Sequence, residues 1–245
     1  GTVPTKAFEH SIPDWLVETL EKELGENWEK EMIALNEQAP TILRANSLKT
    51  STKHLIEELK HENVESFQVP GFENAVQLEE KKNVFLTSAF KDGLFEVQGA
   101  GGKTLHLAAL MENKGQIIAM DIHGWKLAEL KRRAKRAGAH NIETREITDN
   151  KVIKRLQEKA DRLLIDAPCS GLGVLKRNPD SKWKIDQDFI DRIRKEQETI
   201  LQDYSKIIKK GGKMVYATCS ILPSENNEQV ENFLKNNPDF KLIKE

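Results

Sequence analysis

The sequence predicts an α/β protein whose main part is a doubly wound, mostly parallel sheet, preceded by a helical and α+β accessory region. From residue 99 onward, short apolar segments alternate with segments of helical periodicity. A glycine-rich stretch opens this alternation, and a polar loop follows most of the apolar segments. The expected domains are residues 1–98 (accessory) and 99–245 (parallel sheet), and the length of 245 residues suffices for both.

The accessory region shows an interrupted helical pattern and then a mixed pattern. Its predicted elements are, in order, two helices over residues 12–38, a strand over residues 41–46, a helix over residues 52–62 and a strand over residues 64–69. Gly25 interrupts the first helical pattern, and Thr52 suits the N-cap of the third helix. Pro70 and Gly71 then indicate a turn at the end of the second strand.

The second region alternates strands and helices. Its predicted elements are, in order, a helix ending near residue 111, a strand over 116–121, a helix over 125–137, a strand over 141–147, a helix over 152–159, a strand ending at 166, a helix over 189–209 and a strand over 214–217. Gly211 and Gly212 are expected to form the turn before the last strand. Open parallel sheets carry their chemistry at the carboxyl ends of their strands, so the loops after these strands hold the candidate site.

A glycine-rich stretch, Gly99-Ala100-Gly101-Gly102-Lys103, precedes the first helix of this region. Glycines at a helix start let the backbone approach a ligand closely. The Gly-Lys-Thr sequence at its end suggests a phosphate-binding P-loop, but that motif needs a glycine five positions before its last one. Valine occupies that position in this chain, so the stretch favours a different cofactor.

Two aspartates follow the next two strands. Asp121 ends the strand about 20 residues past the glycine stretch, where an acidic residue suits hydrogen bonds to ribose hydroxyls. Asp149 has the equivalent place after the following strand, although helix caps and turns explain both residues nearly as well. Together with the glycines, they indicate an adenosine-containing cofactor, with NAD and S-adenosylmethionine both open at this point.

The chain has only two cysteines, and each follows a strand-like segment. Cys169 comes after the segment that ends at Asp166, and Cys219 comes after residues 213–217. Strand ends of a parallel sheet meet at one edge, so both thiols are candidates for nucleophilic chemistry there. Ordinary half-buried cysteines are the alternative interpretation, because free cysteine is often buried.

The residues around both cysteines resemble motifs of one enzyme family. The sequences Asp166-Ala-Pro-Cys169 and Thr218-Cys219-Ser220 closely resemble those of the RNA cytosine-C5 methyltransferases of the Nop/Sun (Fmu) family. Further similar segments are Arg177-Asn-Pro-Asp180 with Trp183, Pro223 with Glu225 and Asn226, Ala100-Gly-Gly-Lys103, and Leu43-Arg44-Ala-Asn46. The resemblance covers nearly the whole chain. It implies a Rossmann-like methyltransferase sheet, S-adenosyl-L-methionine as cofactor, and structured RNA as partner, ribosomal RNA rather than transfer RNA.

The resemblance also implies a role for each motif residue. Cytosine C5 is a poor nucleophile until a thiolate adds at C6 of the ring. By resemblance, Cys219 is this nucleophile, Cys169 assists elimination and product release, and Asp166 contacts cytosine N3 and contributes to the cofactor site. DNA cytosine methyltransferases have their nucleophile in a Pro-Cys motif, which would reverse the two cysteines. That scheme gives the Thr-Cys motif no role.

Charge and composition narrow the remaining properties. The net charge is −1, so an RNA site has to be a local patch. The candidates for phosphate contacts are Lys176, Arg177, Lys182 and Lys184. Six basic residues over residues 126–136 fit a solvated helix face better than an RNA site. No segment is apolar enough to span a membrane, two distant cysteines suit the reducing cytoplasm, and no metal site is expected.

One region departs from the family pattern. By resemblance, residues 95–98 end the accessory domain, and the helix and first strand expected before Gly99 are absent. An average helix, a strand and their connections amount to roughly 20–25 residues. We expect the natural protein to contain this segment between Gln98 and Gly99, because a sheet without its central strand exposes its core. The family's terminal strands are also expected beyond residue 245.

Two other functions compete with the methyltransferase. A catalytically silent RNA-binding factor that keeps the fold is favoured by the incomplete glycine motif and disfavoured by the intact Cys169, Cys219 and Asp166. A P-loop nucleotidase is disfavoured by Val97.

Overall fold

The computed structural model describes residues 5–97 and 102–244, which fold as two compact units. We call residues 1–39 with 153–245 the terminal unit and residues 40–152 the central unit. The chain therefore leaves the terminal unit after its first helices and returns to it within α8 (Asn150–Arg155). The predicted domain boundary between residues 98 and 99 lies outside the described residues and stays a prediction.

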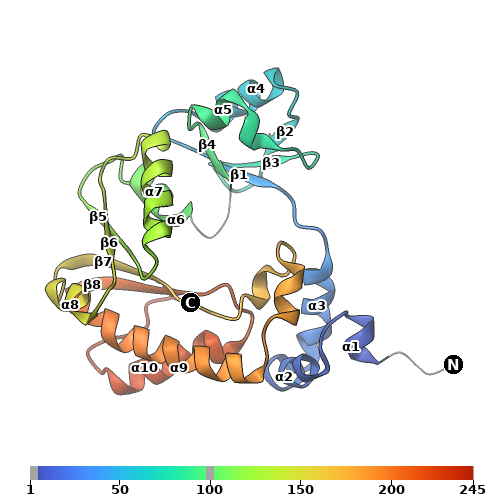
Figure 1. The fold of residues 1–245 in the computed structure, drawn as a ribbon, viewed down its shortest axis with the longest axis vertical. Coiled ribbons are helices and arrows are strands. Elements are labelled where there is room, and N and C mark those ends of the chain that lie inside the picture. The colour runs from blue at the N-terminus through green and yellow to red at the C-terminus, as the bar shows by residue number, and fades with distance from the viewer. Residues whose placement is uncertain (1–4, 98–101, 245) are drawn as a thin grey trace. The chain divides into compact units, whose positions relative to one another are not determined.

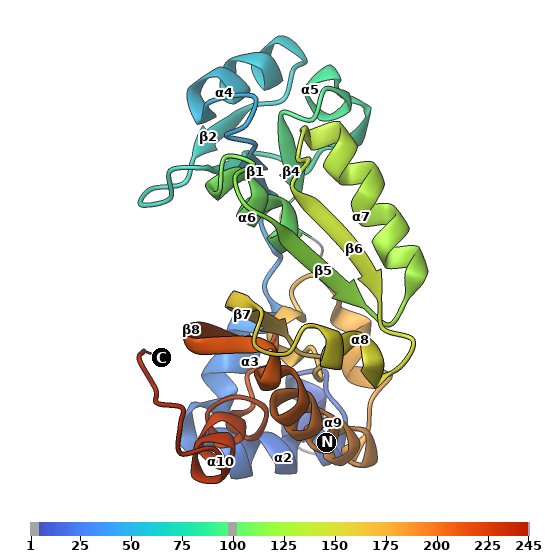
Figure 2. The ribbon, with the colours of Figure 1, turned by 90° about the vertical axis from the view of Figure 1, so that its left-hand side faces the viewer.

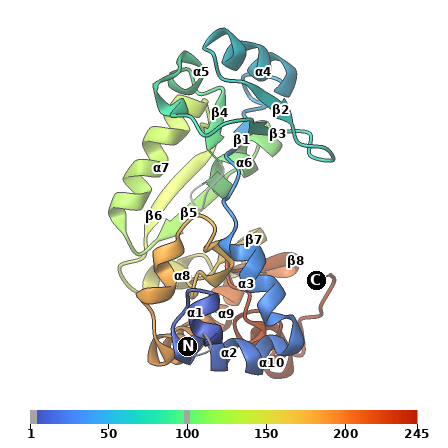
Figure 3. The same ribbon diagram turned by 90° about the vertical axis from the view of Figure 1, so that its right-hand side faces the viewer.

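The terminal unit begins with three helices, the second and third of which meet at a glycine. They are α1 (Lys6–Glu9), α2 (Asp14–Leu24) and α3 (Trp28–Asn36), with a short 3-10 turn, η1 (Gly25–Asn27), before α3. Gly25 caps α2 with a φ of 56°, a conformation that L side chains rarely adopt, and this explains the predicted break. Figure 3 shows these helices in the same unit as α9 and α10.

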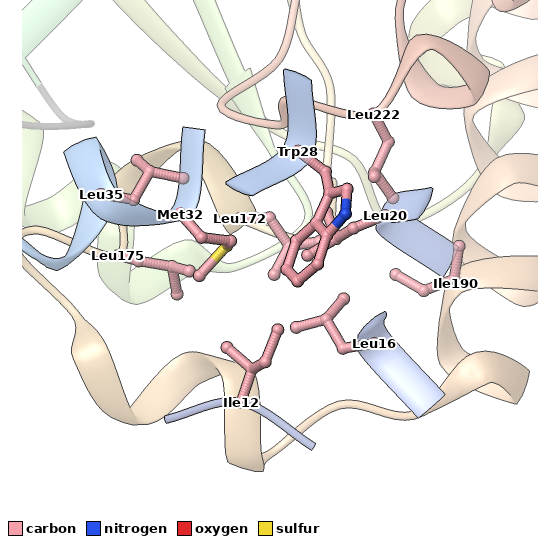
Figure 4. Close-up of a cluster of buried hydrophobic side chains, with 10 residues drawn as sticks. All are labelled: Ile12, Leu16, Leu20, Trp28, Met32, Leu35, Leu172, Leu175, Ile190 and Leu222. Carbon is pink, nitrogen blue, oxygen red and sulfur yellow. The ribbon is translucent and has the colours of Figure 1, made fainter. Parts of the chain in front are cut away.

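A buried cluster packs the first helices against two loops that are distant in sequence (Figure 4). Trp28 and Met32 of α3 and Leu20 of α2 meet side chains from the second half of the chain. The complete cluster is Ile12, Leu16, Leu20, Trp28, Met32, Leu35, Leu172, Leu175, Ile190 and Leu222. Since Leu172 follows Cys169 and Leu222 follows Cys219, these helices support both cysteine loops by apolar packing.

Two parallel strands form the sheet of the terminal unit. They are β7 (Ala160–Asp166) and β8 (Ile208–Ala217), connected through η4 (Leu172–Val174), η5 (Pro179–Trp183), α9 (Gln187–Tyr204) and η6 (Ser205–Ile207). After β8 come η7 (Pro223–Glu225) and α10 (Asn227–Asn236). The predicted turn at Gly211 and Gly212 lies inside β8 instead: the register passes from Ala160↔Ile208 to Arg162↔Lys213, so the extra residues bulge out of the strand.

Helices cover one face of this sheet. Ile165 packs with Leu201 of α9 and Phe233 of α10, and Figure 1 shows these helices beside the two strands. Leu164 and Val215 are register partners that point to the opposite face, where they are 38% and 56% exposed. Parallel sheets ordinarily have both faces covered, so this second face is unusual in being open.

The central unit begins with an antiparallel sheet of order β2-β3-β1-β4. Its elements are β1 (Ile42–Ala45), α4 (Thr52–His61), β2 (Ser66–Gln68), β3 (Ala75–Leu78), η2 (Val84–Leu86), α5 (Ser88–Lys91) and β4 (Phe95–Val97). Because β4 pairs with β1, residues 95–97 end this α+β part, as the resemblance implied. The predicted N-cap is wrong by one residue: the Ser51 hydroxyl accepts the His54 N–H, and the Thr52 hydroxyl donates to the carbonyl of Glu73.

A second, parallel pair completes the central unit. Figure 2 shows β5 (Ile117–Asp121) beside β6 (Ile142–Glu146), with α7 (Gly124–Ala137) along them. The helix α6 (Lys103–Leu110) packs against the same pair through Leu105 and Ala108. In the described part of the chain, β5–β6 and β7–β8 are separate two-stranded sheets, and no described strand joins them.

The basic helix α7 is only partly solvated. Glu96 of β4 is 8% exposed and accepts hydrogen bonds from Arg133 Nε and Nη2, at 3.0 and 2.8 Å, and from Arg136 Nη2 at 2.5 Å. Arg136 also stacks over the Phe90 ring, 4.0 Å from its centroid. The expected solvated face is therefore wrong for these two arginines, which attach α7 to the antiparallel sheet.

We expect Trp28→Ala to destabilise the terminal unit by about 3–5 kcal/mol, because it leaves a cavity in the cluster that supports both cysteine loops. Urea denaturation followed by circular dichroism measures this change. Trp183→Ala is the matched control, since Trp183 is 59% exposed in the same unit and should cost at most about 0.5 kcal/mol. Equal effects of the two substitutions would contradict this account of the core.

Candidate active site

The two cysteines of the chain meet at one edge of the β7–β8 sheet. Asp166 and Ala217 are register partners at the carboxyl ends of the strands, and the cysteine loops follow directly. The sulfur atoms of Cys169 and Cys219 lie 3.2 Å apart, and the backbone N–H of Cys219 donates to the Cys169 sulfur at 3.3 Å. The structure thus brings together two thiols that are 50 residues apart in sequence.

Backbone hydrogen bonds tie the two cysteine loops to each other. The Ala167 N–H donates to the Ala217 carbonyl at 2.9 Å, which extends the sheet past its last register pair. Further along, the Gly173 N–H donates to the Cys219 carbonyl, also at 2.9 Å. A Cβ at residue 173 would lie 2.9 Å from that carbonyl oxygen, so the close approach of the loops requires glycine there.

A buried carboxylate connects the residues that follow the cysteines. Glu225 of η7 is fully buried and accepts from the Ser170 N–H at 2.8 Å, from the Ser170 hydroxyl at 2.5 Å and from the Ser220 hydroxyl. The Gln197 amide of α9 donates to the same carboxylate at 3.0 Å and to the Pro168 carbonyl at 2.8 Å. From sequence, Glu225 was expected only as part of a motif, and Gln197 was missed. The signal for Glu225 was an acidic residue within the short loop that follows Cys219.

The thiols differ in environment. Cys219 is exposed, whereas Cys169 is half-buried. The hydrogen bond with Cys219 raises the pKa of the Cys169 thiol above its ordinary value, and burial raises it further. Cys169 is therefore harder to ionise than an ordinary thiol, and its neighbour Cys219 is open to solvent. Asp166 is exposed at the end of β7, three residues before Cys169.

The predicted cofactor residues other than Asp166 belong to the central unit. Gly99, Ala100 and Gly101 lie outside the described residues. Gly102 caps α6, its carbonyl accepts from Arg44 Nη1 at 3.2 Å, and Lys103 is the first residue of the helix. Arg44 thus holds the end of the glycine stretch against β1, a contact that sequence reasoning missed.

Both predicted ribose-binding aspartates make local contacts. Asp121 ends β5, and its carboxylate accepts from the His123 N–H at 2.8 Å and lies 3.6 Å from the Lys126 ammonium. Asp149 accepts from the Lys151 N–H at 2.8 Å. The cap and turn roles that the sequence left open are therefore both present, and the carboxylate of Asp121 remains partly exposed.

The predicted phosphate-contact residues after the Cys169 loop differ in accessibility. Lys182 is buried, with its ammonium 3.3 Å from the Asn36 side-chain oxygen, and burial lowers its pKa. Lys176 pairs with Glu37 at 3.1 Å. Arg177 and Lys184 are exposed, the latter 3.8 Å from Asp180. Lys182 is therefore a packing residue in this structure rather than part of an open basic patch.

Two parallel strand pairs with helices, and two thiols that meet where the strands of one pair end, place the chain in the α/β class. Comparison with known families makes the assignment specific. The family described as "16S rRNA methyltransferase RsmB/F" matches residues 85–245, and its ferredoxin-like domain matches residues 12–85. The chain belongs to this family, which agrees with the Nop/Sun resemblance.

Two relatives and one solved structure illustrate the likeness. The chain is 34% identical to a probable ribosomal RNA small subunit methyltransferase B of Synechocystis sp., over 95% of this chain and 58% of the relative. It is 31% identical to the probable enzyme of the same name from Bacillus subtilis, over 96% of this chain and 58% of the relative. The crystal structure of NSun6 from Pyrococcus horikoshii with SFG has a TM-score of 0.82 at 21% identity, covering 91% of this chain and 87% of that one. The predicted methyltransferase fold with its N-terminal accessory domain is thereby confirmed.

The alignments also measure how much of each relative this chain spans. The chain spans little more than half the length of these two relatives. In the Synechocystis alignment, 95% of the 245 residues, or about 233, extend over 261 aligned positions, so about 28 positions have no counterpart here. The Bacillus alignment gives about 235 residues over 261 positions, an excess of about 26.

The described residues contain neither a membrane span nor a metal cluster. No described helix is both long and apolar enough to cross a membrane. No group of three or more His, Cys, Asp or Glu residues within residues 5–97 and 102–244 is arranged to hold a metal ion.

We expect iodoacetamide at pH 7.5 to modify Cys219 before Cys169, because the raised pKa of Cys169 leaves less of it as the reactive thiolate. Cys219→Ala removes the main cause of that raised pKa, so the alkylation of Cys169 should become several-fold faster. Peptide mapping by mass spectrometry between pH 6 and pH 9 measures both rates. Faster alkylation of Cys169 in the unsubstituted chain would contradict the assignment.

Proposed function

We propose that the chain is the methyltransferase part of an enzyme that methylates cytidine C5 in structured RNA, and that ribosomal RNA is its substrate. The observation that carries this proposal is the pair of thiols 3.2 Å apart at the edge of the β7–β8 sheet. The names of the relatives support the substrate class, because both are probable ribosomal RNA small subunit methyltransferases. A target base has to leave its stack to reach a thiol at such an edge.

The two thiols have different roles in the proposed reaction. Cys219 is exposed and adds as thiolate to cytosine C6, which makes C5 electron-rich. Cys169 keeps its proton, so its S–H can donate to the Cys219 sulfur and stabilise the thiolate before attack. After methylation, a base removes the C5 proton, the Cys219–C6 bond breaks, and C5=C6 is restored. Cys169 lies where it can return a proton to the departing thiolate.

Asp166 is proposed to bind the cytosine N3 edge. It is exposed at the end of β7 and three residues before Cys169, so it belongs to the same strand edge as the thiols. A hydrogen bond or proton given to N3 withdraws electrons from C6 as the thiolate adds. Asp166 is also proposed to contribute to the cofactor site.

S-adenosyl-L-methionine is the proposed cofactor, and it supplies the methyl group when bound. The residues at the proposed site suit this cofactor. Gly102 and Lys103 lie at the start of α6, and the partly exposed Asp121 carboxylate, at the end of β5, can accept a hydrogen bond from a ribose hydroxyl. The NSun6 structure from Pyrococcus horikoshii contains SFG, an analogue of this cofactor. Gly99, Ala100, Gly101 and Asp149 complete the proposed cofactor set.

RNA contacts are proposed for the exposed side chains after the Cys169 loop. Arg177 and Lys184 are the best candidates, and Lys176 joins them once its contact with Glu37 opens. Lys182 would have to leave its buried position to contribute. The two free thiols suit a reducing cytoplasm, and we retain that location as part of the proposal.

We further infer that the intact protein carries a helix and a strand at the junction of residues 98 and 99. The alignment excess of about 26–28 positions is slightly above the roughly 20–25 residues expected of this segment. Leu164 and Val215 leave one face of the β7–β8 sheet open, and in the described chain β5 and β7 each pair on one side only. These are the features expected of a sheet that lacks its central strand and one covering helix.

The second candidate is a catalytically silent RNA-binding factor. The open face at Leu164 and Val215 favours it, because a protein that lacks part of its sheet loses part of its cofactor site. The paired thiols oppose it, since RNA binding alone needs no cysteines.

Labelled methyl transfer from S-adenosylmethionine to unmodified ribosomal and transfer RNA tests the function. We expect label in 5-methylcytidine of ribosomal RNA, complete loss with Cys219→Ala, and accumulation of a covalent RNA adduct with Cys169→Ala. Loss of adduct formation with Cys169→Ala alone would reverse the two thiols. RNA binding without transfer, in a chain that includes the proposed segment, would favour the silent factor.

Restoring the segment tests the inferred gap. A chain with a helix and a strand of a relative's sequence inserted after Gln98 should bind S-adenosylmethionine at least roughly tenfold more tightly than the present chain, because the proposal places part of the cofactor site in that segment. Isothermal titration calorimetry measures both affinities. Asp121→Ala in the extended chain is the control and should weaken binding again. Equal affinities of the extended and present chains would argue against the gap.

A further inference from the structure

We propose that Glu225 is a positioning residue that holds Cys169 and Cys219 at reacting distance. It binds the residue that follows each cysteine, Ser170 and Ser220, and therefore fixes the two loops relative to each other. The inference deepens the proposed function, because it concerns how the same thiol pair is kept ready.

The contacts of Glu225 fit an anion that joins two loops. Its two oxygens accept from four donors: the Ser170 N–H and hydroxyl, the Ser220 hydroxyl and the Gln197 amide. The two serine hydroxyls also lie 3.1 Å from each other. An ionised carboxylate is acceptor-only, so it satisfies donors that converge from both loops. A buried charge is stable only when such donors surround it.

Glu225 is itself held through its backbone and through its carboxylate. Tyr216 of β8 donates its hydroxyl to the backbone carbonyl of Glu225 at 2.8 Å, which anchors η7 to the strand that leads to Cys219. Gln197 bridges from α9 to the Pro168 carbonyl, next to Cys169. Each cysteine loop is thus tied to Glu225 both directly, through its serine, and through a second residue.

Ordinary packing does not explain this arrangement. The apolar cluster holds Leu172 and Leu222, which lie three residues beyond each cysteine, but apolar contacts are non-directional. Hydrogen bonds from the residues adjacent to the cysteines have directional geometry and set the backbone from which each thiol projects. Glu225 therefore determines the sulfur separation, whereas the cluster determines whether the loops fold at all.

The matched test compares two buried carboxylates. Glu225→Gln keeps the shape but introduces an NH₂ group among the converging donors. Glu96→Gln makes the same chemical change in the central unit, which contains neither cysteine loop and where Glu96 binds two arginines. Both substitutions should lower stability, so thermal unfolding alone does not distinguish a positioning role from a structural one.

Phenylarsine oxide provides a readout of thiol geometry that needs no methyl transfer. Its trivalent arsenic condenses with two thiols to form two As–S bonds and one water, with no change of oxidation state. A stable product forms only when both sulfurs reach one arsenic atom. The unsubstituted chain and Glu96→Gln should form this product with equal affinity, measured by loss of both free thiols and by intact mass.

We expect Glu225→Gln to weaken the arsenical affinity roughly tenfold to a hundredfold, the range seen when outer partners of metal ligands are removed. Circular dichroism has to show a folded chain at the assay temperature. A folded Glu225→Gln chain that binds the arsenical as tightly as Glu96→Gln would overturn the proposal. Because the assay uses the thiols alone, failure of the methyl-transfer proposal leaves this result unaffected.

A second variant covers the case in which Glu225→Gln does not fold. Ser220→Ala deletes one hydroxyl donor and leaves the carboxylate with three, so it should fold and weaken arsenical binding by a smaller factor, about threefold to tenfold. Unchanged binding in a folded Ser220→Ala chain would overturn the proposal as well. Where methyl transfer is measurable, Glu225→Gln should lower kcat and leave the KM for S-adenosylmethionine unchanged, since the proposed cofactor residues other than Asp166 lie in the central unit.

Discussion

Parallel pairing of β7 with β8 is the constraint on which the thiol site depends. Two strands that run in the same direction end at the same edge, so residues about 50 positions apart emerge side by side. The loops then continue the pairing through Ala167 and Ala217, and Gly173 closes against the Cys219 carbonyl. Close approach of the sulfurs is therefore a consequence of strand direction, strand length and one glycine.

Strand pairing alone leaves each loop free to turn away from the other. The serine that follows each cysteine prevents this by donating to the same buried carboxylate. The first helices of the chain add apolar packing under both loops through Leu172 and Leu222. Residues from the N-terminal end, β7, α9 and β8 thus all contribute to one small region. The first helices therefore support the thiol site, in addition to any role as part of an accessory domain.

Sequence periodicity predicted most strands and helices of the described chain, because apolar spacing is a local property. It missed the short elements α1, β3 and α5, which have only four residues each. The errors lie where a distant partner decides the outcome. The periodicity of α7 predicts that Arg133 and Arg136 face solvent. In the structure both pair with Glu96, which lies on β4, and β4 takes its place by pairing with β1. The sequence places Lys182 in a basic loop, but in the structure its ammonium contacts the side-chain oxygen of Asn36, which is distant in sequence. Ser51 and Thr52 are adjacent hydroxyl residues, and the sequence does not distinguish which one caps α4.

The two halves of the proposed reaction depend differently on the absent segment. The thiol pair is complete within the terminal unit: its strands, helices and buried carboxylate are all present, and its own hydrogen bonds hold it. The proposed cofactor residues other than Asp166 begin at the junction where the segment is inferred to belong, and Leu164 and Val215 are exposed on one face of β7–β8. Covering an apolar side chain of this size is worth about 1.5–3 kcal/mol. The segment would therefore stabilise the sheet and complete the cofactor site together, whereas the geometry of the sulfurs does not require it.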